Sequence, residues 1–113
     1  MNVVRTKAGV LFFQIAPAGF RILSAIDQTA AALSTDLVIT SGTDGEHSGP
    51  ADPHHTGEAY DVRSQGFSPE LKQAILNGVM VKLGFDRFYG FIEDPGTDNE
   101  HFHFQRKKDT TYP

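Results

Sequence analysis

Residues 101–105, His101-Phe102-His103-Phe104-Gln105, alternate imidazole and phenyl side chains and end in an amide. Successive side chains of a β-strand point to opposite faces of a sheet, so this alternation predicts a strand with both phenyl rings on one face. Phenyl rings favour a core from which water is excluded. The stretch therefore predicts a sheet that is covered on one face and presents two imidazoles together on the other.

Two segments elsewhere in the chain have the pattern of helices. After Pro17, apolar residues recur at steps of three or four and predict an amphipathic helix over 18–34. Ser68-Pro69-Glu70 combines a capping serine, a proline suited to the first turn and an acid, which predicts a second helix over 68–83. Gly84 is placed to end that helix.

Short apolar or β-branched runs predict the remaining strands, at 9–15, 37–40, 58–62 and 88–92. The order strand, helix, strand, loop, strand, helix, strand, strand is typical of an α+β fold with two main helices and a mostly antiparallel sheet. With 113 residues, the chain has room for one small domain over 1–113 and no second one.

The composition excludes several classes of function. Ten basic residues against fourteen acidic ones give a formal charge of −4 with no basic block, so we expect no nucleic-acid partner. No run approaches the ~20 apolar residues of a membrane span, so we expect no membrane partner. The chain has no cysteine, which excludes disulfides, thiolate zinc sites and cysteine nucleophiles. Any metal must therefore be held by His, Asp and Glu.

The N-terminal stretch has some features of a secretory signal, because Arg5 and Lys7 precede an apolar run that ends in Ala16-Pro17-Ala18. Gln14 interrupts this run, which is already short for a signal peptide. We therefore expect no signal peptide and a chain that is cytoplasmic as synthesised. We also expect the chain to be a monomer.

Residue types that bind metals fall into two clusters. His54 and Asp61 are seven positions apart, with Gly57 between them to permit a sharp chain reversal. The second cluster is the pair His101 and His103. A catalytic zinc site takes three protein ligands from His and carboxylate and keeps one position open. We predict His54, Asp61 and His103 as the ligands.

The loop before Gly57 offers alternatives to His54. His55 or His47 would replace it if the loop folded differently, although the register with Gly57 and Ala59 favours His54. The acidic residues of this loop also raise the question of a calcium site, but their positions match no EF-hand, and we interpret them as solvated. They are Asp44, Glu46 and Asp52.

The two clusters together resemble a known family, the zinc D-alanyl-D-alanine carboxypeptidases and dipeptidases with the related phage endolysin peptidases. The family pattern is Ser-x-His-x-x-Gly-x-Ala-x-Asp, followed much later by Glu-x-x-His. The matching positions here are His54, Gly57, Ala59 and Asp61 in the first motif, and Glu100 and His103 in the second. The resemblance covers nearly the whole chain and implies a hedgehog/DD-peptidase-like fold.

The resemblance also implies an activity. One Zn²⁺ per chain would be held by the three predicted ligands, and Glu100 would be the general base that moves a proton from the attacking water to the leaving amine. His101 would stabilise the charge of the tetrahedral intermediate. The substrate would be a peptidoglycan stem peptide, and carboxypeptidase and endopeptidase modes both stay open. A phage-encoded protein of this kind would reach the cell wall on lysis.

Two positions depart from the family pattern. Thr43-Asp44 follow Ser41-Gly42 where the family commonly has an arginine, and Asp52 stands in place of the motif serine. Neither change removes a ligand, but both bear on substrate preference. The missing arginine motivates a second hypothesis, a non-catalytic zinc-binding module that recognises a peptide or a protein partner.

Overall fold

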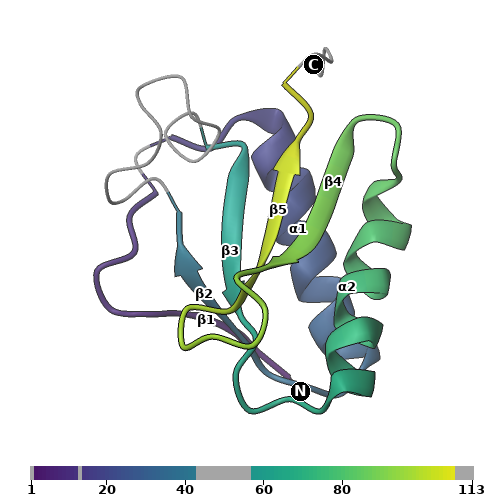
Figure 1. Cartoon of the computed structure of the whole chain (residues 1–113). Helices are drawn as coiled ribbons and strands as arrows, with labels where there is room; N and C mark the ends of the chain where they lie inside the picture. The colour runs from purple at the N-terminus through teal and green to yellow at the C-terminus, as the bar shows by residue number, and fades with distance from the viewer. Residues whose placement is uncertain (1, 13, 43–56, 109–113) are drawn as a thin grey trace.

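The computed structural model of the chain describes residues 2–12, 14–42 and 57–108 (Figure 1). In this part of the chain, two helices and five strands alternate as an α+β fold, as the sequence predicts. Their bounds are β1 Val4–Thr6, α1 Pro17–Ala32, β2 Leu37–Ser41, β3 Ala59–Arg63, α2 Pro69–Leu83, β4 Phe88–Glu93 and β5 His101–Arg106.

The strands form one mostly antiparallel sheet in the order β1-β2-β3-β5-β4. β1 and β2 are parallel, and the other neighbouring pairs are antiparallel. Both helices pack on the same side of this sheet (Figure 1). One face of the sheet is therefore covered by helices, and we call the other the open face. Neither helix has the length and apolar character needed to cross a membrane.

The core lies between the helices and the covered face. Phe102 and Phe104 of β5 are fully buried there, beside Tyr60 and Val62 of β3. The imidazoles of β5 lie on the open face, so the predicted alternation is confirmed. Because the period of a strand is two, burying the phenyl rings also fixes where the imidazoles lie.

The ends of α2 follow the predicted signals. The Ser68 hydroxyl accepts a hydrogen bond from the Leu71 N–H at 3.1 Å, which satisfies one of the free donors of the first turn. At the other end Gly84 has φ +81°, a conformation that glycine adopts without a Cβ clash. The Gly84 N–H donates to the Met80 carbonyl at 2.8 Å and closes the helix.

The predicted strand at 9–15 is wrong. The first strand is the short β1, and the chain turns directly after it at Gly9, which has φ +89°. In this turn the Val10 N–H donates to the Lys7 carbonyl at 3.2 Å. Residues 10–12, 14 and 15 then continue without strand pairing.

The apolar run after Gly9 is used for packing instead. Val10 packs against the core, and the Phe12 ring stacks on Tyr60 with a centroid distance of 5.9 Å. Leu11 remains 42% exposed. A continuous apolar run indicates burial without distinguishing a strand from an irregular segment, which explains the error.

Candidate metal centre

The open face brings the predicted residues of β3 and β5 together through the register of these strands. Asp61 lies opposite His103, and Arg63 lies opposite His101. Directly opposed residues of an antiparallel pair share a face and have closely spaced side chains. The strand pairing therefore joins one residue from each of the two motifs, across 42 positions of sequence.

Gly57 lies at the start of the segment that carries Asp61. It has φ +75°, and a Cβ at this position would lie 2.1 Å from the Gln14 carbonyl oxygen. Its own carbonyl accepts a hydrogen bond from the Tyr60 hydroxyl at 3.1 Å. The predicted need for glycine at this turn is confirmed, because any side chain here would meet both backbone strain and a clash.

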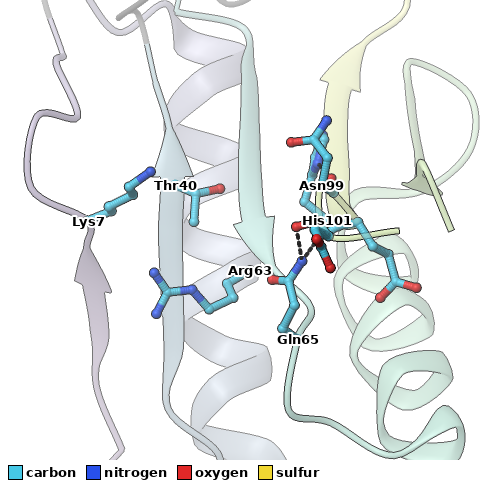
Figure 2. Close-up of a pocket in the computed structure, with 8 residues that line it drawn as sticks. Lys7, Thr40, Arg63, Gln65, Asn99 and His101 are labelled. Carbon is cyan, nitrogen blue, oxygen red and sulfur yellow. Dashed lines mark hydrogen bonds between the residues drawn. The ribbon is translucent and has the colours of Figure 1, made fainter. Parts of the chain in front are cut away.

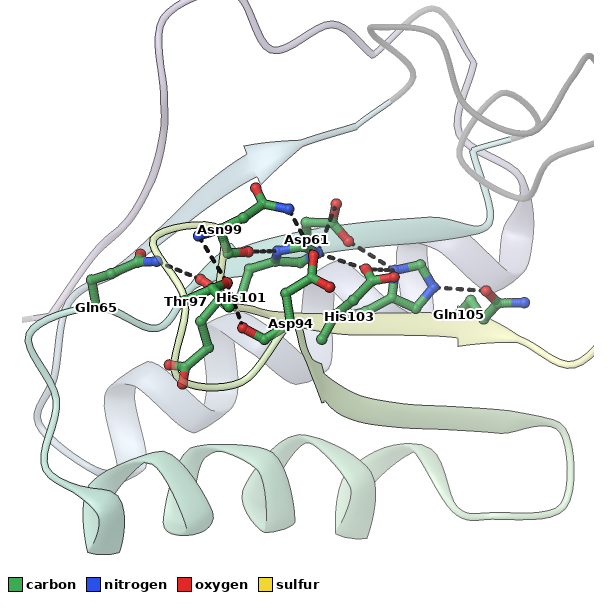
Figure 3. Close-up of polar contacts among 10 residues, drawn as sticks. Asp61, Gln65, Asp94, Thr97, Asn99, His101, His103 and Gln105 are labelled. Carbon is green, nitrogen blue, oxygen red and sulfur yellow. Dashed lines mark hydrogen bonds and ion pairs between the residues drawn. The ribbon is translucent and has the colours of Figure 1, made fainter.

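His103 is held by partners on both ring nitrogens (Figure 3). Its Nδ1 lies 2.8 Å from Asp61 Oδ1, and its Nε2 lies 2.7 Å from Gln105 Oε1. The Gln105 amide nitrogen donates to the Arg106 carbonyl, which turns the amide oxygen toward the imidazole. Both ring nitrogens thus face acceptors, an arrangement that favours the protonated imidazole.

The pKa of His103 follows from this geometry. Burial by itself lowers the pKa, since the charged form loses solvation. The hydrogen bonds to Asp61 and Gln105 and the negative charges of Asp61 and Glu93 outweigh burial, so the pKa is raised above its ordinary 6.5. Metal binding at Nδ1 must displace a proton, while the Nε2–H keeps Gln105 as its acceptor.

Glu93, at the end of β4, completes the cluster from the other side of β5. The register places Glu93 opposite His101, and its Oε1 lies 2.7 Å from His101 Nε2. The same Oε1 is 4.0 Å from His103 Nδ1, and His101 Nε2 is 3.6 Å from Asp61 Oδ2. Two carboxylates and two imidazoles therefore meet at one point of the open face.

His101 is oriented by the turn that precedes β5. Its Nδ1 lies 2.6 Å from the Asn99 carbonyl, so the other nitrogen faces the cluster. Burial lowers the pKa of His101, but the bond to Asn99 and the charges of Asp61 and Glu93 together raise it. The imidazole is thereby prepared to donate a hydrogen bond toward the centre.

Asp61, Glu93 and His103 each offer a ligand atom, and these atoms lie within 4.8 Å of one another. Nitrogen and carboxylate oxygen are ligands that zinc accepts, so the donor set fits this metal. Two of the three predicted ligands, Asp61 and His103, are thus brought together. The third, His54, lies outside the described residues, as do the alternatives His47 and His55.

Glu100, to which the resemblance assigns the role of general base, makes its contacts away from the cluster of Asp61, Glu93 and His103. Its carboxylate accepts hydrogen bonds from the Ser64 hydroxyl at 2.5 Å, from Lys72 Nζ of α2 at 2.6 Å and from the Gly96 N–H at 3.1 Å. The bonds from Lys72, Ser64 and Gly96 hold the pKa of Glu100 at about 2. The carboxylate is therefore engaged on the α2 side of the sheet.

Glu93 is not among the site residues that the sequence predicts. The predicted strand ended at Ile92 and left Glu93 in the turn-rich segment that follows, whereas β4 extends through Glu93. Pairing the last two strands as a hairpin before assigning roles would have placed Glu93 opposite His101. That pairing is a tertiary property, and only the alternation within each strand is visible from local sequence.

The open face beside the candidate metal centre is not uniform. On β4, Tyr89 and Phe91 stack at a centroid distance of 6.0 Å, and Phe91 lies 5.3 Å from the His103 ring. On the β1–β3 side, a cleft of about 170 Å³ is lined by charged and polar residues that include Lys7 and Arg63. The centre thus lies between an aromatic surface and a polar cleft.

Comparisons of the chain with protein-family models, with curated proteins and with solved structures found no match. The resemblance to zinc peptidases therefore rests on the motif residues alone. The contact between Asp61 and His103 is a separate observation, made on the structure.

Proposed function

We propose that the chain is a zinc-dependent metallopeptidase that hydrolyses peptide bonds of peptidoglycan stem peptides, on a hedgehog/DD-peptidase-like fold. The observation that carries this proposal is the contact of Asp61 with His103 on the open face, at 2.8 Å. These residues come from two separate motifs, and the family resemblance assigns both to the metal. The register of β3 with β5 places Asp61 directly opposite His103, as two ligands of one metal would require.

Zinc bound here would polarise the scissile carbonyl and make water a stronger nucleophile near neutral pH. Asp61 and His103 would hold it, with His54 as the third ligand from the motif or Glu93 from the cluster. Gln105 would accept the remaining N–H of His103 and keep the ring oriented, as partners of ligating histidines commonly do.

Two carboxylates compete for the role of general base. The resemblance assigns it to Glu100, whose low pKa and three hydrogen bonds make it a poor proton acceptor near neutral pH. Glu93 is close to His103 and lies beside His101 on the open face. We infer that Glu93 moves the proton and that Glu100 secures the start of β5. His101 would donate a hydrogen bond toward the developing oxyanion.

The proposal is tested first by metal content. Elemental mass spectrometry of the purified chain should give about one zinc per chain, as a single catalytic site requires. His103→Ala and Asp61→Asn should lose this zinc, whereas Asp86→Asn, the same change at an exposed carboxylate of another surface, should keep it. No bound zinc and no uptake on addition would overturn the proposal.

Turnover separates the roles of the remaining residues. The zinc-loaded chain should hydrolyse muropeptides, and Glu93→Gln should lower kcat by about 10²–10⁴-fold, the usual contribution of a general base. Zinc retained in Glu93→Gln but lost in His54→Ala would assign His54 as ligand and Glu93 as base. Zinc lost in Glu93→Gln would make Glu93 a ligand instead. A larger turnover loss in Glu100→Gln, with the fold intact, would restore Glu100 as the base.

The second candidate is a non-catalytic zinc-binding module. The observation that favours it is the Thr43-Asp44 pair after Ser41-Gly42, where the family commonly has an arginine. A module of this kind would bind one zinc and show no turnover with any muropeptide, in the parent chain as in Glu93→Gln.

If the chain is instead a peptidase that is encoded by a phage, its peptidoglycan substrate would become accessible on lysis.

A further inference from the structure

The polar cleft on the open face lies next to the metal centre and shares His101 with it (Figure 2). Its walls come from separate parts of the chain: Lys7 directly after β1, Thr40 on β2, Arg63 at the end of β3 and Asn99 before β5. Figure 2 shows Lys7 and Arg63 on one side and Asn99 and His101 on the other. The sheet order thus assembles a binding site that no single motif contains.

The two cations of this cleft differ from others in the described chain. Lys72 is paired with Glu100, and Arg106 is paired with Glu58. Lys7 and Arg63, by contrast, are exposed and form no ion pair with the described residues. Two cations that converge on a concave polar surface, without a paired carboxylate, provide a site for an anion.

Neither of the two acids that line the cleft forms an ion pair with Lys7 or Arg63. Glu100 is neutralised by Lys72, at 2.6 Å. Asp98 is the other acid, and it is exposed. Gln65 Nε2 donates hydrogen bonds to two backbone carbonyls of this turn, those of Asp98 and, at 2.6 Å, Glu100. Gln65 thereby ties the turn before β5 to the end of β3 and gives the cleft a fixed shape.

We propose that this cleft binds the carboxylate of a peptide ligand, with Arg63 and Lys7 as its partners and the hydroxyl of Thr40 as a further donor. The guanidinium matches the two oxygens of a carboxylate. The role of the cleft in catalysis rests on the proposed peptidase function. A substrate whose free carboxylate binds beside the metal centre would have its C-terminal residue oriented for removal. The class of substrate is then a peptide with a free C-terminus, cut in carboxypeptidase mode.

The test measures ligand binding to the zinc-loaded full chain. Binding is monitored by changes in the backbone amide chemical shifts during NMR titrations. The ligands are N-acetyl-D-alanyl-D-alanine, the same dipeptide with a C-terminal amide, and inorganic phosphate. We expect the acid to shift the amides of Lys7, Thr40, Arg63 and Gln65. Arg63→Gln should weaken its binding by about tenfold or more, the usual contribution of a charge-assisted hydrogen bond. Lys7→Gln should act in the same direction, and Lys108→Gln, which removes one exposed charge elsewhere, should change nothing.

Each other outcome overturns the proposal. Equal affinity for the acid and the amide would show that the carboxylate is not recognised. An unchanged affinity in Arg63→Gln and Lys7→Gln would place the contact elsewhere, and absent shifts would exclude this ligand. Phosphate bound more tightly than the acid would make the cleft a general anion site. These readouts need no turnover, so a chain that binds the acid without hydrolysing it would retain the cleft and lose the peptidase proposal.

Discussion

The two faces of the sheet carry charged groups in different ways. On the covered side, the Glu100 carboxylate is matched by Lys72, by the Ser64 hydroxyl and by one backbone N–H. On the open face, Asp61, Glu93 and two imidazoles meet, with the protons of the imidazoles as the only positive charge among these four residues. The first network pairs its carboxylate with a lysine, whereas the positive charge among these four residues of the second depends on protonation of the imidazoles. This difference separates a carboxylate with a structural role from the carboxylates for which we propose a chemical one.

The sharpest way to test the comparison is to truncate neighbouring residues of β5. Phe104→Ala removes a fully buried ring from the covered face and should lower the free energy of unfolding by about 3–5 kcal/mol. His103→Ala, one position away on the open face, should cost far less stability in the metal-free chain. Urea unfolding of both variants without zinc measures the two values. Equal losses would mean that the open face is as much a part of the core as the covered one.

A smaller effect is expected from the partner of His103. Gln105→Leu removes the acceptor of the His103 Nε2–H and should weaken zinc binding by about 10–100-fold, because such partners orient the ligating ring. Competition with a chelator of known affinity measures this change. Gln73→Leu, on the surface of α2, is the matched control and should leave zinc affinity unchanged. A Gln105→Leu variant with parental affinity would remove the assigned role of the amide.

The smallest effect should appear in the acid range and should sharpen the structural role of Glu100. The pKa of Glu100 is lowered from 4.5 to about 2, chiefly by Lys72 and Ser64, so its ionised form is favoured by folding. Its contribution to stability is therefore fully present above pH 4.5 and is lost as the pH falls toward 2. The stability difference between the parent chain and Glu100→Gln should narrow over this interval. A difference that stays constant between pH 6 and pH 2.5 would contradict the ion pair.

The sequence predicted the fold where local pattern and burial coincide. The alternation of residues 101–105 gave the strand and both of its faces, and Ser68 and Gly84 marked the ends of α2. At 9–15 the pattern indicated burial alone. The described residues of this stretch form no strand, and Phe12 packs on Tyr60. Apolar character reports contact with a core, but backbone pairing depends on which edge of the sheet is free.

The candidate site was predictable in part for the same reason. Asp61 and His103 belong to motifs, and the register of β3 with β5 brings them together. The importance of Glu93 depends on the pairing of β4 with β5, which no motif encodes. Arg63 and Lys7 likewise line one cleft only because of the order of strands in the sheet. Residues that are brought together by the order of strands cannot be identified from local sequence motifs.

The shortness of β1 has a consequence for dynamics. This edge strand has three residues and is anchored by the Lys7 N–H on the Ile39 carbonyl and by the Val3 N–H on Asp36. Short edge elements with few buried contacts open locally at a lower free energy than the global transition. Lys7 therefore directly follows a strand that we expect to open locally, with exchange of its amide hydrogens, before the whole sheet unfolds. A ligand that engages Lys7 would slow this exchange, linking occupancy of the cleft to closure of the sheet edge.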